Sequence, residues 1–411
     1  MSHNLSGEKG TGETDRKGAN PMKKILSLIL CITMVATLAV LGASAESEKT
    51  DALKVGICVA GSLGDQGFYD SANDGLQKLA ADYGVVGSVV ECKNDASAYE
   101  PALVEAAEQN DVVVAVGWEF WDGLDVVAPE MPDTKFIFVD NGMTGHDNLL
   151  AITYKENQGS FLVGYIAMKL SKTGKVGVIG GEDSDTINNF IVGYKQGALY
   201  ANPDGEVLDP IYTNDYEDPA KGKESALALN SKGADVIFQV ADKTGLGVFE
   251  AAQEKGFYAI GVDKDQKSEN PDVVVCSMLK HVGESVYQAV AQYIDEGVFN
   301  GGEIWDADLS TGLVGVGYGD ETMPQQVSDD LKAEVAELAQ KIIDGEIVVD
   351  PTRYAGLKPC TPHRAHGARE AWRERQLAAE LPPLGGGPRG SRKGQCPLTP
   401  DCAPWARRAH G

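Results

Sequence analysis

The feature that most constrains the fold is an alternation of apolar strands with helical segments between residues 54 and 263. Short runs rich in Val and Ile, such as KVGICVA at 54–60 and VVVAV at 112–116, alternate with stretches of helical apolar spacing. Continuously apolar strands separated by helices are typical of parallel sheets that are covered on both faces. The predicted strands are 54–60, 86–91, 112–116, 135–140, 175–180, 235–240, 259–263, 273–279 and 313–318.

The same pattern indicates two lobes rather than one. There are more strands than a single doubly wound sheet holds comfortably, and the pattern restarts at Lys175, after the long helical segment ENQGSFLVGYIAMKLSK. We therefore expect two doubly wound α/β lobes with parallel sheets, joined by a hinge that the chain crosses several times. The expected bounds are 52–155 and 273–298 for lobe 1, 175–272 for lobe 2, 312–347 for a final strand and helix, and 150–175, 270–275 and 298–312 for the crossings.

The segment at 22–45, MKKILSLILCITMVATLAVLGASA, has the features of a signal peptide. A Lys pair precedes an apolar stretch that ends in Ala43-Ser44-Ala45, which is the pattern of an export signal. We therefore expect export to the periplasm or to the outer face of the plasma membrane. A retained membrane helix is the alternative, because the apolar span is close to transmembrane length. No lipidation cysteine is visible, and residues 1–21 are interpreted as an upstream extension.

The composition changes again at about residue 350. Nine of the ten Arg residues lie between Arg353 and Arg408, in a stretch without sustained apolar periodicity. Such a composition is typical of disorder, so we interpret 351–411 as a disordered and compositionally foreign tail. A basic arm for anionic partners and an undirected linker are the alternatives. The Cys and His residues of the tail match no zinc-site spacing.

The region between these ends, 46–350, is strongly acidic. It contains 54 Asp and Glu, 20 Lys and no Arg, a net charge of −34. This charge argues against nucleic acid or an anionic membrane as a direct ligand. The region also contains Cys58, Cys92 and Cys276, an odd number in apolar contexts, which does not suggest a disulfide framework.

Aromatic and acidic residues recur where the predicted strands end, which is where parallel α/β sheets bind ligands. The first strand leads into GDQGFYD (64–70) and the third into GWEFWD (117–122). Trp118 or Trp121 of the second motif could line a cleft, and core packing is the alternative. Further candidates follow later strands, namely Asp140, Tyr216, Gly245, Gly247, Asp263 and Lys280.

Facing loops of this kind would form a cleft with flat apolar walls and anionic acceptors, which suits a heterocycle joined to a polyol. An aromatic side chain that stacks on a base contributes about 1–3 kcal/mol. Ionised Asp accepts hydrogen bonds from hydroxyl groups, each worth roughly 1.5–3 kcal/mol. A phosphate would be repelled, so a nucleoside fits this cleft better than a nucleotide.

Several motifs in one order resemble the basic membrane protein family, the extracytoplasmic substrate-binding proteins of ATP-binding-cassette importers. They are GDQGFYDSANDG, PDTKFIFVD, KENQGSFLVGYIAMKLSKTGKVGVIGG, YEDPAKGKE, GADVIF with TGLGVFEAA, IGVDKDQ and SMLK. The resemblance covers about 52–350. It implies a type I periplasmic-binding fold that closes on its ligand, a purine nucleoside, and a membrane permease as partner. It implies no cofactor.

The resemblance also implies roles for individual residues. Phe68 and Tyr216 would stack on the base, and Asp140 and Asp263 would hold the ribose hydroxyls. Lys280 would contact the ligand or pair with an acid. Asp65 and Asp70 would shape the first loop, and Gly245 and Gly247 the facing loop. Tyr69 stands where the family often has Asn, which leaves the base preference open.

Each candidate also has a structural explanation that involves no ligand, such as helix capping by an Asp that follows a strand. No GxGxxG follows the first strand, and Walker A, GxSxG and HExxH motifs are missing from the sequence. We therefore expect a monomeric binding protein without catalytic residues, metal or cofactor. A sensor that reports ligand to a membrane receptor is the alternative, and a secreted nucleoside hydrolase is less favoured.

Overall fold

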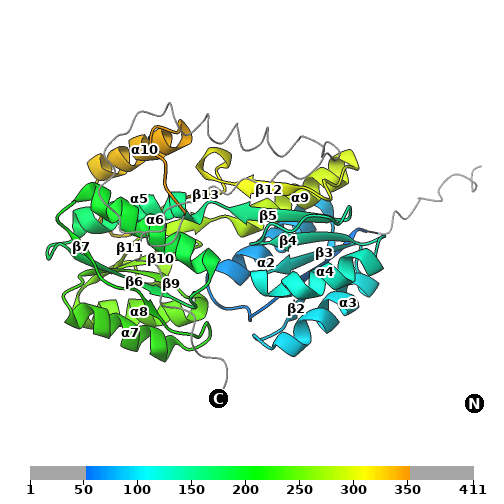
Figure 1. Ribbon diagram of the computed structural model, residues 1–411, viewed down its shortest axis with the longest axis horizontal. Coiled ribbons are helices and arrows are strands. Elements are labelled where there is room, and N and C mark those ends of the chain that lie inside the picture. The colour runs from blue at the N-terminus through cyan, green and yellow to red at the C-terminus, as the bar shows by residue number, and fades with distance from the viewer. Residues whose placement is uncertain (1–51, 352–411) are drawn as a thin grey trace, which may run out of the picture. The chain divides into compact units, whose positions relative to one another are not determined.

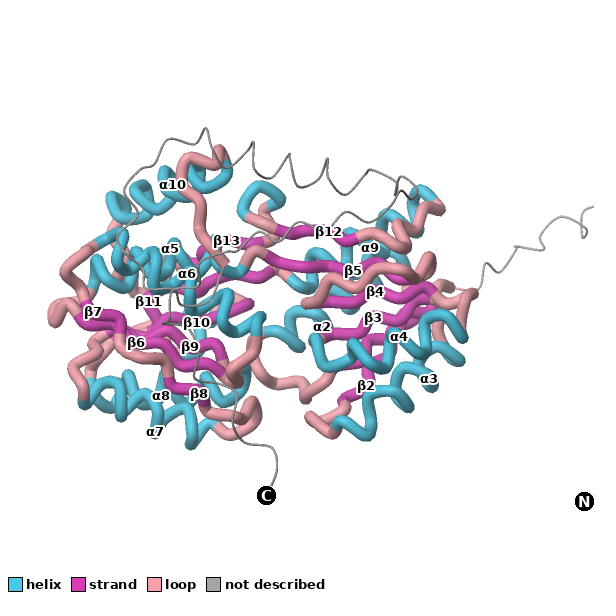
Figure 2. The backbone as a smooth tube through the Cα atoms, in the orientation of Figure 1, coloured by secondary structure: helices cyan, strands magenta, loops and turns pink. Residues whose placement is uncertain are grey.

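Parallel strands form most of both sheets in the computed structural model, which describes residues 52–351 (Figure 1). The predicted upstream extension and signal peptide lie outside these residues. The predicted tail also lies outside them, except for its first residue, Pro351. Figure 2 shows the strands in two separate groups, each flanked by helices. The type I periplasmic-binding fold is therefore confirmed, with two α/β lobes.

Within residues 52–351, the sheet of lobe 1 has six parallel strands in the order β12-β5-β4-β3-β1-β2. Its central strands are buried along almost their whole length, which explains their uninterrupted apolar sequences. The strands are β1 (Lys54–Val59), β2 (Val86–Glu91), β3 (Val112–Val116), β4 (Lys135–Val139), β5 (Leu149–Tyr154) and β12 (Ile304–Ala307).

Helices cover both faces of this sheet. Right-handed crossovers place α2 (Phe68–Tyr83) on one face and both α3 (Tyr99–Gln109) and α4 (Trp121–Glu130) on the other. Helix α9 (Val282–Glu296) packs against α2, and Gly75 and Gly283 allow their backbones to come close, since a Cβ on either would overlap the facing helix.

The sheet of lobe 2 has seven strands among the described residues, and of these only β13 is antiparallel to its neighbour. The main order is β13-β11-β10-β9-β6-β7, and β8 also pairs with β6. The strands are β6 (Lys175–Gly180), β7 (Glu206–Val207), β8 (Ile211–Tyr212), β9 (Val236–Val240), β10 (Tyr258–Asp263), β11 (Val274–Lys280) and β13 (Val314–Gly317).

The helices of lobe 2 pack in closely spaced pairs. Helix α5 (Glu156–Leu170) packs on α6 (Asp185–Ala201), and a Cβ on Gly164, Gly193 or Gly197 would overlap the backbone of the facing helix. Helices α7 (Pro219–Ser231) and α8 (Asp242–Lys255) form the second pair, and α10 (Asp329–Ile343) packs against α5. None of the helices within 52–351 is long and apolar enough to span a membrane.

The chain crosses between the lobes at 154–156, 280–282 and 307–314, which corrects two of the predicted boundaries. Strand β11 lies in the sheet of lobe 2, so 273–280 does not belong to lobe 1, and the second crossing is not at 270–275. The connection from β10 to β11 contains a 3₁₀ turn at Gln266–Glu269 instead of a crossover helix, so the sequence pattern did not identify the two strands as neighbours. Helix α5 also belongs to lobe 2, which begins near residue 156.

The strand orders place the carboxyl ends of four strands at the points where each sheet reverses its winding direction. In lobe 1 this point lies between β1 and β3, and in lobe 2 it lies between β6 and β9. Crevices at such points are where open α/β sheets bind ligands. The segments that follow these four strands, including the first turns of α2, α6 and α8, supply more than half of the residues of the candidate site.

Candidate ligand-binding site

The loop between β1 and α2 is shaped by two carboxylates. The buried Asp65 accepts hydrogen bonds from the backbone N–H groups of Gly67 (3.2 Å), Tyr69 (2.8 Å) and Asp70 (3.0 Å). Asp70 accepts from Gly64 and Gln66, both at 2.9 Å. Burial raises the pKa of Asp65 to about 6, although these backbone donors oppose the shift. Neither acid lines the cavity described below, so their visible role is to hold the loop that presents Phe68 and Tyr69.

A buried cation, Lys280, lies at the centre of the site. Its ammonium group forms an ion pair with Asp140 and a second one with Glu156 at 3.3 Å. It also lies over the rings of Phe68 and Tyr154, at 4.8 and 4.9 Å from their centroids. Burial alone would lower the pKa of Lys280, but the surrounding carboxylates raise it above its ordinary value. Lys280 therefore stays charged and organises the acids around it.

Three acids in the cavity have left-handed backbone angles, which non-glycine residues rarely adopt. The φ angles are 80° at Asp140, 44° at Asp242 and 64° at Asp263. Asp140 and Asp263 come directly at the ends of β4 and β10, where the left-handed turn redirects the chain after the strand. Strained residues of this kind persist only where the surrounding structure holds them in place, and they occur most often at functional sites.

Asp263 has an incompletely satisfied carboxylate. Its side chain is 5% exposed, and Oδ1 has no hydrogen-bond partner among the described residues. Burial raises its pKa to about 8, with Lys280 opposing the shift. An acceptor that is buried at a cost and left without a donor marks a place where a ligand hydroxyl can bind.

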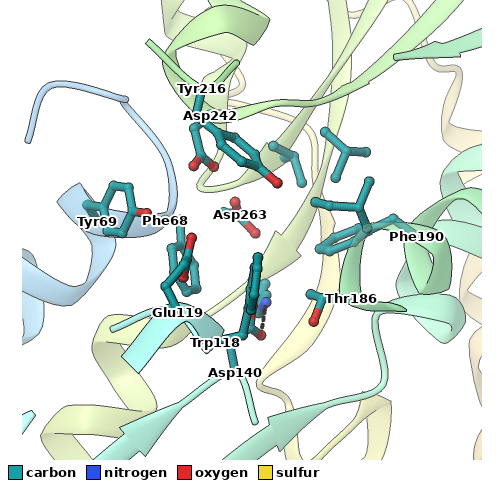
Figure 3. Close-up of a pocket in the computed structure, with 15 residues that line it drawn as sticks. Phe68, Tyr69, Trp118, Glu119, Asp140, Thr186, Phe190, Tyr216, Asp242 and Asp263 are labelled. Atoms are coloured by element: carbon teal, nitrogen blue, oxygen red, sulfur yellow. Dashed lines mark hydrogen bonds and ion pairs between the residues drawn. The ribbon is translucent and has the colours of Figure 1, made fainter. Parts of the chain in front are cut away.

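Aromatic side chains from both lobes surround these acids (Figure 3). Phe68, Tyr69 and Trp118 come from lobe 1, and Phe190 and Tyr216 come from lobe 2. The inner cavity that they line has a volume of about 40 Å³. It shares Trp118, Glu119 and Tyr216 with an outer cavity of about 630 Å³, whose other acids are Glu100, Asp122, Glu182 and Asp215.

Seven of the eleven sequence-predicted residues line the inner cavity, namely Phe68, Tyr69, Trp118, Asp140, Tyr216, Asp263 and Lys280. Gly245 and Gly247 do not. They lie inside α8 rather than in a loop, where Gly245 packs against Gln239 and Gly247 against the backbone of Pro219. Trp121 is 40% exposed and packs against Phe138 instead of the cavity.

Sequence reasoning missed several cavity residues. Asp242 lies two residues after the end of β9, much as Asp263 lies at the end of β10, so its position near the end of a strand was a usable signal. Glu119 stands inside the GWEFWD motif, next to the predicted Trp118. Thr186, Ile187 and Phe190 lie on α6, and only the packing of the lobes brings them to the site.

No group of three or more His, Cys, Asp or Glu side chains within 52–351 is arranged to hold a metal ion. Cys58, Cys92 and Cys276 are buried, and none of them forms a disulfide with another described residue. The site therefore consists of aromatic faces, buried carboxylates and one paired cation between two lobes.

This fold and this cleft define a solute-binding protein. The chain belongs to the Bmp family, described as ABC transporter substrate-binding protein PnrA-like, whose model matches residues 52–352. It is 32% identical to basic membrane protein A of Borreliella burgdorferi over 335 residues, which cover 80% of this chain and 96% of the relative.

Solved structures agree with this assignment. An ABC transporter solute-binding protein from Aeropyrum pernix K1 is 27% identical, with a TM-score of 0.65, covering 79% of this chain and 98% of that one. Another, from Conexibacter woesei, is 26% identical with a TM-score of 0.61, covering 73% of this chain and 99% of that one. Both of these structures are described as solute-binding proteins of ABC transporter systems.

Proposed function

We propose that this substrate-binding protein captures a purine nucleoside between its lobes and delivers it to a membrane permease. The observation that carries the proposal is the combination, in one inter-lobe cavity, of aromatic faces with Asp263, a buried acceptor that has a free oxygen among the described residues. Flat walls suit a base, and the acids Asp140 and Asp263 suit ribose hydroxyls. We further propose that it acts as an exported monomer.

Lobe movement is part of this proposal. A cavity of about 40 Å³ has room for a few water molecules, so a nucleoside would enter an open form and be enclosed as the lobes close on it. The ligand favours the closed form only by as much as it binds that form more tightly. The permease would then recognise the closed arrangement of the two lobes.

The test is calorimetric titration of the purified chain with guanosine, inosine, adenosine, cytidine and ribose. We expect binding at micromolar or lower concentration for at least one purine nucleoside and loss of that binding in Asp263→Ala. A folded protein that binds ribose alone, or none of the five, would contradict the nucleoside assignment.

A further inference from the structure

Glu119 has an unusual position in the cavity. It lies in the 3₁₀ turn Trp118–Phe120 directly after β3 and lines both the inner and the outer cavity. Its Oε2 atom is buried and has no hydrogen-bond partner among the described residues. Gly117, two residues before Glu119, has a φ of 121°, and a Cβ at this position would overlap Oε2 of Glu119. The backbone is therefore shaped to accommodate the carboxylate.

The surroundings of Glu119 offer it little compensation for burial. The titratable groups that act on it are Tyr69 of α2, Tyr99 of α3, Asp140 after β4, Glu182 after β6, Tyr216 before α7, Asp242 of α8 and Lys280 of β11. Of these, only Lys280 is a cation, and it already pairs with Asp140 and Glu156. Burial accordingly raises the pKa of Glu119 to about 7, although a hydrogen bond from its own backbone N–H and the charge of Lys280 oppose the shift.

A buried carboxylate that has one oxygen without a partner among the described residues, and that lies beside aromatic walls, can bind the edge of a stacked base. Ionised, it is an acceptor only and matches two neighbouring N–H donors, such as the ring N–H and exocyclic amine of guanine. Protonated, it has one donor and one acceptor, which match the ring nitrogen and amine of adenine. Asparagine or glutamine would match adenine in the same way as the protonated acid.

We propose that Glu119 determines base specificity, by accepting N–H donors from the edge of the bound purine and so favouring 6-oxopurine nucleosides over adenosine. This inference rests on the proposed nucleoside function and specifies the base that the same site prefers. Ligand contact with Oε2 would give that buried atom the donor that the described residues do not provide.

The proposal predicts opposite pH dependences for two ligands of one site. Guanosine binding requires the ionised acid, so its binding at acidic pH releases a proton to solvent, and its affinity rises with pH. Adenosine binding requires the protonated acid, so its affinity falls with pH. For a group that titrates near pH 7, each affinity changes by about tenfold between pH 6 and pH 8.

The experiment is titration of the purified chain and of Glu119→Gln with guanosine, inosine and adenosine at pH 6 and pH 8. At pH 8 the variant should lose about tenfold or more in guanosine affinity and should bind adenosine more tightly than the parent chain does. Its affinities should also lose the pH dependence that Glu119 confers. Glu130→Gln, the same charge change at an exposed position of α4, should change neither preference nor pH dependence.

Two kinds of outcome are distinguishable. If the parent chain binds purine nucleosides with parallel pH dependences, and Glu119→Gln keeps the same order of preference, then the specificity role of Glu119 is wrong while the proposed function stands. If the parent chain binds no nucleoside, both proposals are wrong. The pH titration of the parent chain decides the question even if the variant fails to fold.

Discussion

At the scale of single residues, Asp263 illustrates a conflict between binding and stability. Its pKa is raised to about 8, so between roughly pH 4 and pH 8 the folded chain binds this proton more tightly than the unfolded chain does. The free energy of unfolding therefore falls as pH rises through that window. The carboxylate is retained at a cost, which is the expected behaviour of a binding residue rather than a structural one.

Asp263→Asn should separate these two effects. Asn tolerates a φ of 64° and cannot ionise, so the variant should be more stable than the parent chain at pH 8, by a margin on the order of 3 kcal/mol, and much less so at pH 4. Its nucleoside affinity should fall at least tenfold. Urea unfolding at both pH values and calorimetry would measure this.

The matched control for this experiment is Asp133→Asn, which removes an exposed carboxylate from the loop before β4. It should change neither the pH dependence of unfolding nor binding. A stability gain of Asp263→Asn that was equal at both pH values would contradict the ionisation argument.

Gly117 tests the backbone support of Glu119. In Gly117→Ala the added methyl group would meet the Glu119 carboxylate and also approach Ala60 to 3.2 Å. Gly145→Ala is the control, because Gly145 has a φ of 98° and open space around its Cβ position. Both variants should lose about 1–2 kcal/mol of stability through backbone strain. Only Gly117→Ala should also lose discrimination between guanosine and adenosine, measured by titration.

At the scale of secondary-structure elements, the buried side chain of Gln266 connects the two lobes. Oε1 of Gln266 accepts from the Val262 N–H (2.9 Å) and from Gln239 Nε2 (2.7 Å) within lobe 2. Its Nε2 donates to the carbonyl oxygen of Gln66 in lobe 1, at 3.1 Å. Gln66 belongs to the loop that presents Phe68. Gln266 therefore links the end of β10 in lobe 2 to the loop between β1 and α2 in lobe 1 through hydrogen bonds.

Gln266→Glu should weaken this connection while keeping an acceptor for the two hydrogen bonds within lobe 2. The remaining oxygen still accepts from Val262 and Gln239, whereas the ionised acid presents an acceptor to the Gln66 carbonyl. We expect about tenfold weaker nucleoside binding, seen mainly as faster dissociation. Stopped-flow dissociation would measure it.

Because the carboxyl group introduced by Gln266→Glu could donate again once it is protonated, the defect relative to the parent chain should shrink as pH falls. Lys264→Ala, which removes the exposed inter-lobe pair Lys264–Asp74 (2.6 Å), should cost under about 1 kcal/mol. If the two substitutions weakened nucleoside binding equally, the buried hydrogen bond from Gln266 to Gln66 would contribute no more than the exposed ion pair does.

The elements also show which features of the fold the sequence could predict. The central strands of both sheets are buried on both faces, so their apolar runs were visible. Strand β12 is only four residues long and partly exposed at a sheet edge, and β5 runs into α5 without a turn. Both were missed because neither has the bounded apolar run on which the prediction depended.

The site residues that lie at the ends of strands were the most directly predictable. Asp140, Asp263 and Lys280 end β4, β10 and β11, so parallel-sheet geometry sufficed to propose them. Phe190 projects from α6, and Glu156 reaches Lys280 from the first turn of α5. These contacts depend on how the lobes pack, which periodicity does not encode. Gly245 and Gly247 were wrongly predicted to lie in a ligand-binding loop. Glycine is favoured both in such loops and where helices pack closely, so the residue type alone does not distinguish the two.

At the scale of the whole molecule, negative charge should exclude phosphorylated ligands. Residues 46–350 carry a net charge of −34, and three of the acids in this region, Glu100, Asp122 and Glu182, line the outer cavity. Lys280 lies within the inner cavity but is already neutralised by two acids. A phosphate placed about 5 Å from an unpaired carboxylate meets a repulsion of roughly 3 kcal/mol at an effective dielectric constant of about 20.

Guanosine 5′-monophosphate should therefore bind on the order of a hundredfold more weakly than guanosine, as measured by calorimetry. Added salt should reduce this difference in affinity. Screening weakens the repulsion between the phosphate and the partly exposed acids, whereas it has little effect on the binding of the neutral nucleoside. The 5′-O-methyl ether of guanosine separates charge from size, since it adds bulk without charge. If the ether were excluded as strongly as the phosphate, and salt left both unchanged, then the shape of the closed cleft rather than its charge would set the limit on what this protein carries.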